Sequence, residues 1–202
     1  ELGDQHPLSL VERVVDVARA AAERRVLDVK LDAKMAEYLK RVDPQLLWRH
    51  HLKWRRDAEA ASLMEDLAST ESPLDISVRI GYLVRAVEAA RKSEANAGKV
   101  RELDEVLALA RLQQRCADEL GSLAVASQRK ASLLESQARA RSADGDQARA
   151  SRLRNKCAAE AARYSELAAA RTTLTTTLVA VSDLYNDFTS KYALWDLCLV
   201  AM

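Results

Sequence analysis

Glycine, proline and aromatic residues are all scarce in this chain of 202 residues. It contains five glycines and three prolines, and only 4% of its residues are aromatic. With so few aromatic side chains, a core must be built mainly from leucine, valine and alanine, which favours close packing of helices over a sheet sandwich. The common residues are alanine, leucine, arginine and glutamate, which lose little side-chain freedom in a helix. The composition therefore predicts an all-α fold.

Charge of one sign and long apolar runs are also missing. The chain carries 31 basic and 30 acidic residues, for a net charge of +1 at pH 7. A nucleic-acid-binding surface would need a strong basic excess, so nucleic acid is not the expected partner. No apolar run approaches the ~18–20 residues that span a bilayer, and no signal peptide is visible in the first ten residues. We therefore expect no transmembrane segment.

Residue patterns for metal binding or catalysis are absent as well. The three cysteines, Cys116, Cys157 and Cys198, lie far apart along the chain and are expected to be reduced and packed between helices. His50 and His51 are adjacent, so on a helix they point about 100° apart and cannot easily share a metal. No catalytic or nucleotide-binding motif occurs, and no Glu-x-x-His pair supports an α-helical enzyme. We predict a protein that is not an enzyme and needs no cofactor.

Helical periodicity covers most of the chain, and polar residues mark where helices begin. Asp43 precedes Pro44, and Asp75 precedes an apolar stripe, so both aspartates are expected N-caps. Gly81 stands alone inside a predicted helix, where we expect it to permit close approach of a neighbouring helix. The expected helices begin at residue 9, cover 28–41, run from 44 to about 54, begin at 57, run from 75 to about 92, and resume at 99 after a loop at 93–98.

The second half of the chain predicts a long helical hairpin. Residues 142–146, Ser-Ala-Asp-Gly-Asp, form the best turn signal in this half. Narrow apolar stripes on both sides predict two antiparallel helices over residues 122–172 that pack mainly on each other. The second arm is expected to continue towards Leu184, although the threonine cluster at 172–177 favours a bend or helix junction. A last helix is expected over 190–201.

These elements predict an irregular α-solenoid of antiparallel helix pairs with one long protruding hairpin. Residues 1–202 are interpreted as a single α-helical solenoid fragment of a larger protein, because the chain does not begin with Met and ends in an apolar stretch. Residues 122–172 are interpreted as a hairpin inserted within it.

Four segments resemble one family in the same order along the chain. They are LLWRHHLKWRRDAEAASLMEDLA (46–68), DISVRIGYLVRAVEAARKS (75–93), RELDEVLALARLQQRCADEL (101–120) and VSDLYNDFTSKYALWDLCLV (181–200). Together they resemble the C-terminal part of the non-repetitive, WGA-negative nucleoporins, which are large proteins with a β-propeller followed by an α-solenoid. The first forty-five residues match only loosely. The stretch 121–171 is longer and richer in alanine and arginine than the corresponding connection in the family.

The resemblance implies a structural role in the inner ring of the nuclear pore complex, at the nuclear envelope of the nucleus. Its implied partners are other nucleoporins, namely short linker nucleoporin segments that dock on helical surfaces and neighbouring scaffold subunits. The membrane contact of the family is attributed to the propeller, which this chain does not contain. The alternative is another helical-repeat adaptor or a vesicle-coat-like interaction module, with nearly the same fold.

Two groups of residues are candidate partner-binding sites. Trp48 shares a predicted helix face with Leu52 and is expected in the core, whereas Trp54 lies at a helix end beside Arg55 and Arg56. An exposed tryptophan beside arginine is a suitable anchor for a docked peptide, although core packing is the alternative.

The other group lies at the hairpin tip, where arginines could meet an acidic partner, either protein, nucleic acid or phospholipid headgroup, or could simply keep the hairpin soluble. The tip arginines are Arg139, Arg141, Arg149, Arg152 and Arg154.

Overall fold

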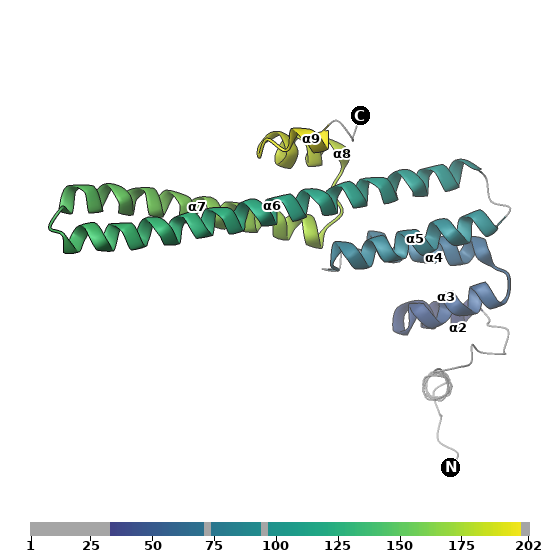
Figure 1. The fold of residues 1–202 in the computed structure, drawn as a ribbon. Helices are drawn as coiled ribbons and strands as arrows, with labels where there is room; N and C mark the ends of the chain where they lie inside the picture. Colours follow the sequence, from purple (N-terminus) through teal and green to yellow (C-terminus); the bar gives the residue numbers. More distant parts are fainter. Residues whose placement is uncertain (1–32, 71–73, 94–96, 199–202) are drawn as a thin grey trace, which may run out of the picture. The chain divides into compact units, whose positions relative to one another are not determined.

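The computed structural model describes residues 33–70, 74–93 and 97–198, and helices dominate this part of the chain (Figure 1). No strand occurs in those three ranges. None of the helices found there is long and apolar enough to cross a membrane. In chain order, the elements are α2 (Ala33–Val42), α3 (Pro44–Lys53), α4 (Asp57–Ser69), α5 (Ile76–Lys92), α6 (Ala97–Ala143), α7 (Gln147–Thr176), α8 (Val181–Asp183), the π-helix η1 (Leu184–Ser190) and α9 (Trp195–Cys198).

The helix starts confirm the predicted capping aspartates. The side chain of Asp43 accepts a hydrogen bond of 3.0 Å from the backbone N–H of Leu46, and Pro44 occupies the first turn of α3. Asp75 accepts a bond of 2.8 Å from the N–H of Ser77 at the start of α5. These bonds satisfy N–H groups that have no partner inside a helix. The helix expected from residue 9 lies outside the described residues.

The chain divides into two compact units, which are described separately. The N-terminal unit comprises residues 1–68 and 82–104, and the hairpin unit comprises residues 69–81 and 105–202. In the N-terminal unit, Leu39 on α2, Met64 on α4, Leu83 on α5 and Leu103 on α6 have no exposed surface. Helices α2 to α5 and the beginning of α6 therefore share an aliphatic core that contains no phenylalanine.

Helix α6 is a single helix of 47 residues that runs through Gly121 without a break. The first arm of the predicted hairpin is thus the continuation of the helix expected from residue 99, and not a separate element. A Cβ atom at Gly121 would lie 3.1 Å from Nε of Arg171 on α7, so this glycine permits close approach. The prediction for Gly81 is wrong, because no atom beyond its chain neighbours and the backbone of its own helix lies within 4 Å of the place where its Cβ would be.

The turn between α6 and α7 confirms the turn predicted at 142–146. Gly145 has a φ of +82°, and the backbone N–H of Asp146 donates to the carbonyl of Arg141 at 3.0 Å. The N–H of Gly145 donates to the carbonyl of Ser142 at 3.3 Å, which completes a Schellman motif around a left-handed glycine. The Asp146 side chain then accepts a bond of 3.0 Å from the N–H of Arg149 and so caps α7.

Small side chains hold the two arms of the hairpin together. Ala138 on α6 and Ala150 on α7 are buried, and the Cys157 thiol donates to the carbonyl of Ala131 at 3.3 Å. The arms touch through small residues because such side chains let the helix backbones approach closely. The structure thus contains the long antiparallel hairpin that the sequence predicted, although the interpretation of residues 122–172 as an insertion stays a prediction.

Helix α7 ends at Thr176 and does not continue towards Leu184. Thr177, which follows it, has an extended backbone with φ −128° and ψ 146°. The threonine cluster therefore marks a helix end, in agreement with the predicted junction. β-branched threonines lose χ1 freedom in a helix, and this weakens the last turns.

Two buried polar side chains hold the end of α7 in place. Arg79, which is 2% exposed, donates to the carbonyls of Thr70 at 2.8 Å and Thr176 at 2.9 Å, and more weakly to that of Leu74 at 3.3 Å. Gln113 is fully buried on α6 and donates to the carbonyl of Leu174 at 2.6 Å. Its side-chain nitrogen also donates to the carbonyl of Thr177, and its oxygen accepts a bond of 3.1 Å from the N–H of Val179. Carbonyls left over at the end of a helix thereby find partners.

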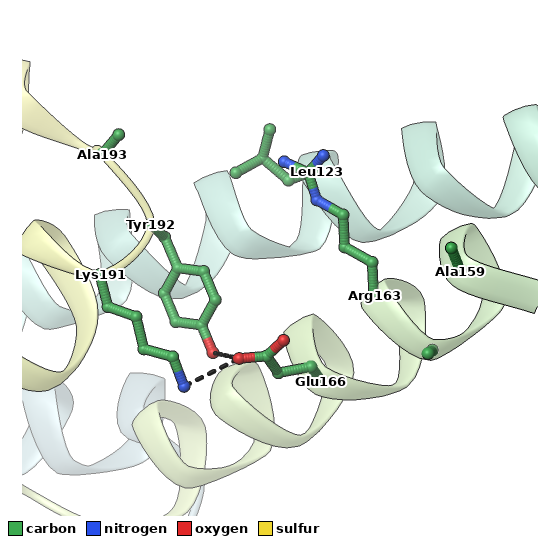
Figure 2. Close-up of a pocket in the computed structure, with 8 residues that line it drawn as sticks. Leu123, Ala159, Arg163, Glu166, Lys191, Tyr192 and Ala193 are labelled. Carbon is green, nitrogen blue, oxygen red and sulfur yellow. Dashed lines mark hydrogen bonds and ion pairs between the residues drawn. The ribbon is translucent and has the colours of Figure 1, made fainter. Parts of the chain in front are cut away.

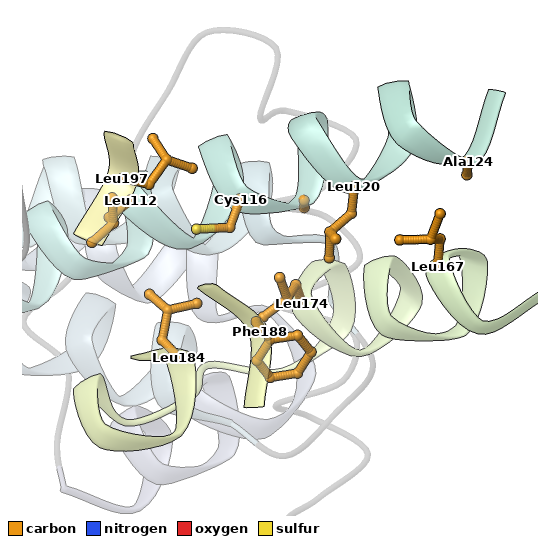
Figure 3. Close-up of a cluster of buried hydrophobic side chains, with 10 residues drawn as sticks. Leu112, Cys116, Leu120, Ala124, Leu167, Leu174, Leu184, Phe188 and Leu197 are labelled. Atoms are coloured by element: carbon orange, nitrogen blue, oxygen red, sulfur yellow. The ribbon is translucent and has the colours of Figure 1, made fainter. Parts of the chain in front are cut away.

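The segment after α7 folds back onto the hairpin base. Leu184, Phe188 and Thr189 of η1 are buried, because residues four and five apart share a face in a π-helix. The helix predicted over 190–201 is wrong for its described part, since Ala193 has a φ of +56° and α9 contains only four residues. Figure 3 shows side chains of α6 and α7 pointing toward one another within the buried cluster. Its members are Leu112, Cys116, Ala117, Leu120, Ala124, Leu167, Leu174, Leu184, Phe188 and Leu197.

Candidate functional site

The first predicted site lies at the corner between α3 and α4 in the N-terminal unit. Trp54 follows the last residue of α3 and is 42% exposed. Its ring centroid lies 6.0 Å from that of His50, which is buried. The indole is therefore supported by a buried ring and still offers apolar surface to solvent. Trp48, predicted in the core, is only half-buried, and the guanidinium of Arg85 lies 5.2 Å from its ring centroid.

The two arginines of this corner differ in their contacts. Arg55 has a φ of +56°, a left-handed conformation that costs a non-glycine residue ~1–2 kcal/mol. The N–H of Arg56 donates to the carbonyl of His51 at 2.9 Å, and its side chain contacts the Glu59 carboxylate at 2.9 Å. The Arg55 guanidinium makes no hydrogen bond or ion pair with any described residue, so Arg55 has the unpaired charge at the corner.

A cavity of about 370 Å³ lies beside this corner, between α2, α3 and α4. His51 and Arg56 line it, together with the apolar side chains of Leu47 and Leu63. Burial lowers the pKa of His51 below its ordinary value, and the positive charge of Arg56 lowers that pKa further. Both effects favour the neutral form of the His51 imidazole, whereas the nearby Glu59 carboxylate opposes them.

The second predicted site is the tip of the hairpin, in the hairpin unit. Arg154 donates to the Ser142 hydroxyl at 3.2 Å, whereas the exposed guanidinium groups of Arg149 and Arg152 have no partner among the described residues. Arg141 lies 3.7 Å from Asp144, and Arg139 pairs with Glu135 on its own helix. The tip therefore gathers the predicted arginines on one exposed end, and two of them carry unpaired charge.

A further cavity lies where the C-terminal segment returns to the hairpin (Figure 2). We call it the hairpin-base cavity, and its volume is about 680 Å³. Lys191 lies 2.8 Å from the Glu166 carboxylate, to which the Tyr192 hydroxyl donates at 3.3 Å. The hydrogen bond from Lys191 and its positive charge lower the pKa of Glu166. The lining residues are Leu123, Ala159, Ala162, Arg163, Glu166, Lys191, Tyr192 and Ala193.

Sequence reasoning did not find this cavity. Its walls come from α6, α7 and residues 191–193, and the last of these reach the hairpin only because the chain turns back after η1. The positive φ of Ala193 that makes this turn has no signal in the sequence, since alanine favours a helix. Such a site is visible only after the tertiary structure is known.

These features define an all-α protein whose candidate binding groups lie on its surface. The candidate groups lie at an exposed corner, at an exposed tip and in an open cavity between helices. Within residues 33–70, 74–93 and 97–198, no group of three or more His, Cys, Asp or Glu side chains could hold a metal ion.

The chain belongs to the non-repetitive/WGA-negative nucleoporin C-terminal family, whose model matches residues 20–202. This match confirms the family resemblance predicted from the sequence, and it includes the hairpin at 122–172. It also favours the nucleoporin hypothesis over the alternative of an unrelated adaptor or vesicle-coat module. No curated protein matches the chain.

The solved structures that are similar to the chain include the Nup170 C-terminal domain of Chaetomium thermophilum. A mutant of that domain and its complex with Nup145N each share 18% identity and a TM-score of 0.66 with the chain, over 98% of this chain and 34% of theirs. A further structure of the domain gives a TM-score of 0.63 at 18% identity, over 95% of this chain and 30% of that one. The chain thus spans about a third of those domains. At this identity the similarity shows the fold, and it confirms the predicted all-α solenoid class.

Proposed function

We propose that the chain is a structural scaffold segment of the nuclear pore complex inner ring, located at the nuclear envelope. In this role the chain binds linker nucleoporin segments or neighbouring scaffold subunits, and it catalyses no reaction. The observation that carries the proposal is the family match over residues 20–202. Membership in a nucleoporin family, together with a fold of packed helices, supports a role in holding partners at fixed positions.

The proposal of a linker partner has separate support. One of the similar structures is a complex of the Nup170 C-terminal domain with Nup145N. We infer that a segment of this kind docks on the described surfaces of the present chain. Helix-in-groove or extended-peptide docking is the expected mode, since both use apolar anchors between helices.

The corner between α3 and α4 is our first candidate for that contact. Trp54 offers exposed apolar surface that is supported from behind, and partly exposed tryptophans are frequent anchors at interfaces. Arg55 keeps a left-handed conformation in which glycine would be more stable, and strained residues of this kind cluster at functional sites. Both observations favour a role of Trp54 and Arg55 beyond packing, whereas Arg56 is engaged with Glu59.

A binding titration tests the proposal. The folded chain is titrated with a fluorescent fragment of Nup145N from the same source, at low and at physiological salt. Saturable one-to-one binding in the micromolar range or tighter is expected. Trp54→Ala should weaken it about tenfold, which corresponds to the loss of about 1.4 kcal/mol expected of an interface anchor.

Two further variants separate binding from folding. Arg55→Gly should raise the unfolding free energy by about 1 kcal/mol, because it relieves the left-handed strain, and should still weaken binding. Leu133→Ala is the matched control, since Leu133 is 57% exposed on the hairpin and far from the corner in sequence. Absence of binding at low salt by a chain with a normal helical circular dichroism spectrum would contradict the linker-docking proposal.

The hairpin tip is our second candidate, for an acidic partner surface. Its support is the unpaired charge of Arg149 and Arg152 together with the nearby Arg154. Reversing all three arginines to glutamate should weaken binding of an acidic scaffold subunit and reduce its salt dependence. The control reverses the exposed arginines Arg111, Arg115 and Arg129, which changes net charge by the same amount. Equal effects of the two triple variants would leave only net charge as the explanation and contradict a specific tip contact.

We further propose that residues 1–202 act as one helical segment of a larger protein, with 122–172 as an inserted hairpin. The support is that the arms between Ala124 and Leu167 bury only small side chains, such as Ala138 and Ala150, whereas the large side chains of the buried cluster lie at the hairpin base.

A further inference from the structure

The hairpin-base cavity has the size and the apolar floor of a binding site. Its volume of about 680 Å³ falls inside the range of ~300–1,000 Å³ that is typical of ligand sites. Leu123 on α6, Ala159 and Ala162 on α7, and Ala193 after η1 supply small apolar surface. Small side chains leave room for the backbone of an incoming segment to approach the helices.

Arg163 brings to this cavity a positive charge that helps to lower the pKa values of Glu160 and Glu166 but forms no ion pair of its own. Its helical neighbours three residues away are Glu160 and Glu166, which are the natural partners of an arginine at that spacing. Glu160 instead pairs with Lys130 on α6, and Glu166 pairs with Lys191 at 2.8 Å. Arg163 therefore makes no hydrogen bond or ion pair with any described residue, and Figure 2 shows its side chain extending from α7 toward α6.

The part of the cavity formed by Glu166, Lys191 and Tyr192 is already neutralised and held in place. Lys191 and the Tyr192 hydroxyl both contact the Glu166 carboxylate, so these three side chains leave no net charge on their side of the cavity. The charged groups that line the cavity are Arg163, Glu166 and Lys191, which gives the lining one net positive charge. A negatively charged group is the complement of such a lining.

We propose that the hairpin-base cavity binds a short segment of a partner protein in which a carboxylate side chain stands next to a small apolar side chain. The carboxylate pairs with the Arg163 guanidinium, whose planar fork of donors suits a carboxylate. The apolar neighbour packs on Leu123 and the alanine floor. A free inorganic anion would use Arg163 alone and leave the floor uncovered, so a peptide is the better fit.

This proposal deepens the proposed function and rests on it only for the origin of the segment. The site itself is tested with a peptide that does not depend on any nucleoporin. The nitrogen-15-labelled chain is titrated with acetyl-Ala-Asp-Leu-Ala-amide, and amide NMR shifts are followed at Leu123, Arg163 and Ala193. Saturable shifts at these amides are expected, together with binding that weakens as salt is added.

Matched peptides and variants make the result specific. The Asn analogue of the peptide should bind at least about threefold more weakly than the Asp peptide. The Arg163→Ala chain should bind the Asp peptide more weakly than the wild-type chain by a similar factor, as expected for an exposed charge pair. Arg152→Ala is the control, because Arg152 is also exposed and unpaired on α7. Both variants should keep the wild-type circular dichroism spectrum.

Three results would overturn the proposal. The first is the absence of saturable shifts at the cavity amides, and the second is equal affinity for the Asp and Asn peptides. The third is a set of cavity shifts produced by inorganic phosphate but not by the peptide, which would make the cavity a simple anion site. Failure of a Nup145N fragment to bind leaves this test unchanged, so the two proposals fail separately.

Discussion

At the scale of single residues, the buried side chain of Arg79 links three segments of the hairpin unit through hydrogen bonds. Its buried guanidinium donates to the carbonyls of Leu74, Thr70 and Thr176, as expected of a buried polar group. Replacement of Arg79 by Ala should lower the unfolding free energy by at least about 3 kcal/mol, because it leaves the carbonyls of Thr70 and Thr176 without their donor. Urea unfolding followed by circular dichroism measures this change.

Arg79→Lys should recover only part of that loss, because an ammonium group cannot reproduce the planar fork of a guanidinium. Arg152→Ala serves as the reference for an exposed arginine and should change the unfolding free energy by less than about 0.5 kcal/mol. Equal stability of the Arg79→Ala and Arg152→Ala chains would show that the buried bonds contribute nothing.

His51 makes stability depend on pH. Its pKa is lowered by burial in the folded chain, so the unfolded chain binds the proton more readily. Stability is therefore retained above the ordinary pKa of 6.5 and is lost as the pH falls below that value. The nearby charges of Arg56 and His50 also lower the pKa of His51, whereas the charge of Glu59 raises it.

We expect the unfolding free energy of the wild-type chain to decrease between about pH 7.5 and 5.5, and that of His51→Gln to decrease less. Urea titrations at several pH values measure both curves. The carboxylates with lowered pKa values, such as Asp75, act only at more acidic pH and do not obscure this window. If the unfolding free energies of the two chains decrease in parallel with pH, His51 is not the cause of the pH dependence.

Residue-level prediction succeeded where the signal was local. Asp43 and Asp75 were identified as caps because a capping side chain lies next to the N–H groups it satisfies. Gly81 was misjudged, and Gly121 was the glycine that needed space, because close approach depends on which helix lies opposite. Arg79 was not singled out, since its three acceptors come from distant parts of the chain.

At the scale of elements, the hairpin can be shortened without loss of its base. The deletion of residues 128–141 together with 148–161 removes two heptads from each arm and keeps the turn at 142–146, so the facing stripes stay in register. The buried cluster at the base is untouched. We expect the shortened chain to unfold cooperatively, with an unfolding free energy that is lower by less than about 2 kcal/mol. Its unfolding free energy should also depend less steeply on urea concentration, because less surface is buried.

A register-breaking deletion is the control for that experiment. Removal of residues 128–129 alone rotates the outer part of one arm by about 200° and turns Ala138 away from α7. This small deletion should destabilise the hairpin more per residue than the long paired one, as measured by urea unfolding. The opposite ranking would contradict packing of the arms through their small-residue stripe.

Element boundaries were predictable where capping or turn residues fixed them, and uncertain elsewhere. The turn at 142–146 was found because its glycine adopts a left-handed conformation that few other residues tolerate. The continuation of α6 through Gly121 was missed, since tertiary packing offsets the ~1 kcal/mol that a glycine costs in a helix. The π-helix η1 was not predictable from the sequence, because its buried side chains, Leu184, Phe188 and Thr189, are positioned by tertiary packing.

At the scale of the whole molecule, balanced charge should make stability nearly independent of salt. The 31 basic and 30 acidic residues leave a net charge of +1, and the described ion pairs are largely exposed. Raising the salt from about 0.05 to 0.5 M should change the unfolding free energy by less than about 1 kcal/mol, since exposed pairs contribute little. Urea unfolding at both salt concentrations measures this change, and a larger one would indicate stronger ion-pair networks.

The sequence predicted the fold class and the family but only part of the candidate sites. Helical propensity is spread over the whole chain and therefore predicts the fold class even where single residues depart from it. The segments that resemble the family are long, so the family is also predicted despite local differences. Trp54, Arg55 and the tip arginines stood out because they sit next to predicted helix ends. The hairpin-base cavity did not, because Arg163 and Lys191 are brought together only by the return of the C-terminal segment.

The length of α6 has a mechanical consequence inside the hairpin unit. From residue 105 to Ala143 the helix rises about 58 Å, at ~1.5 Å per residue. It therefore acts as a lever, and a tilt of one degree at the base moves the tip by about 1 Å. A ligand that tilts α6 by a few degrees at the base would displace Arg149 and Arg152 by several ångströms. Binding at the base would therefore change the position of the tip relative to any partner bound there.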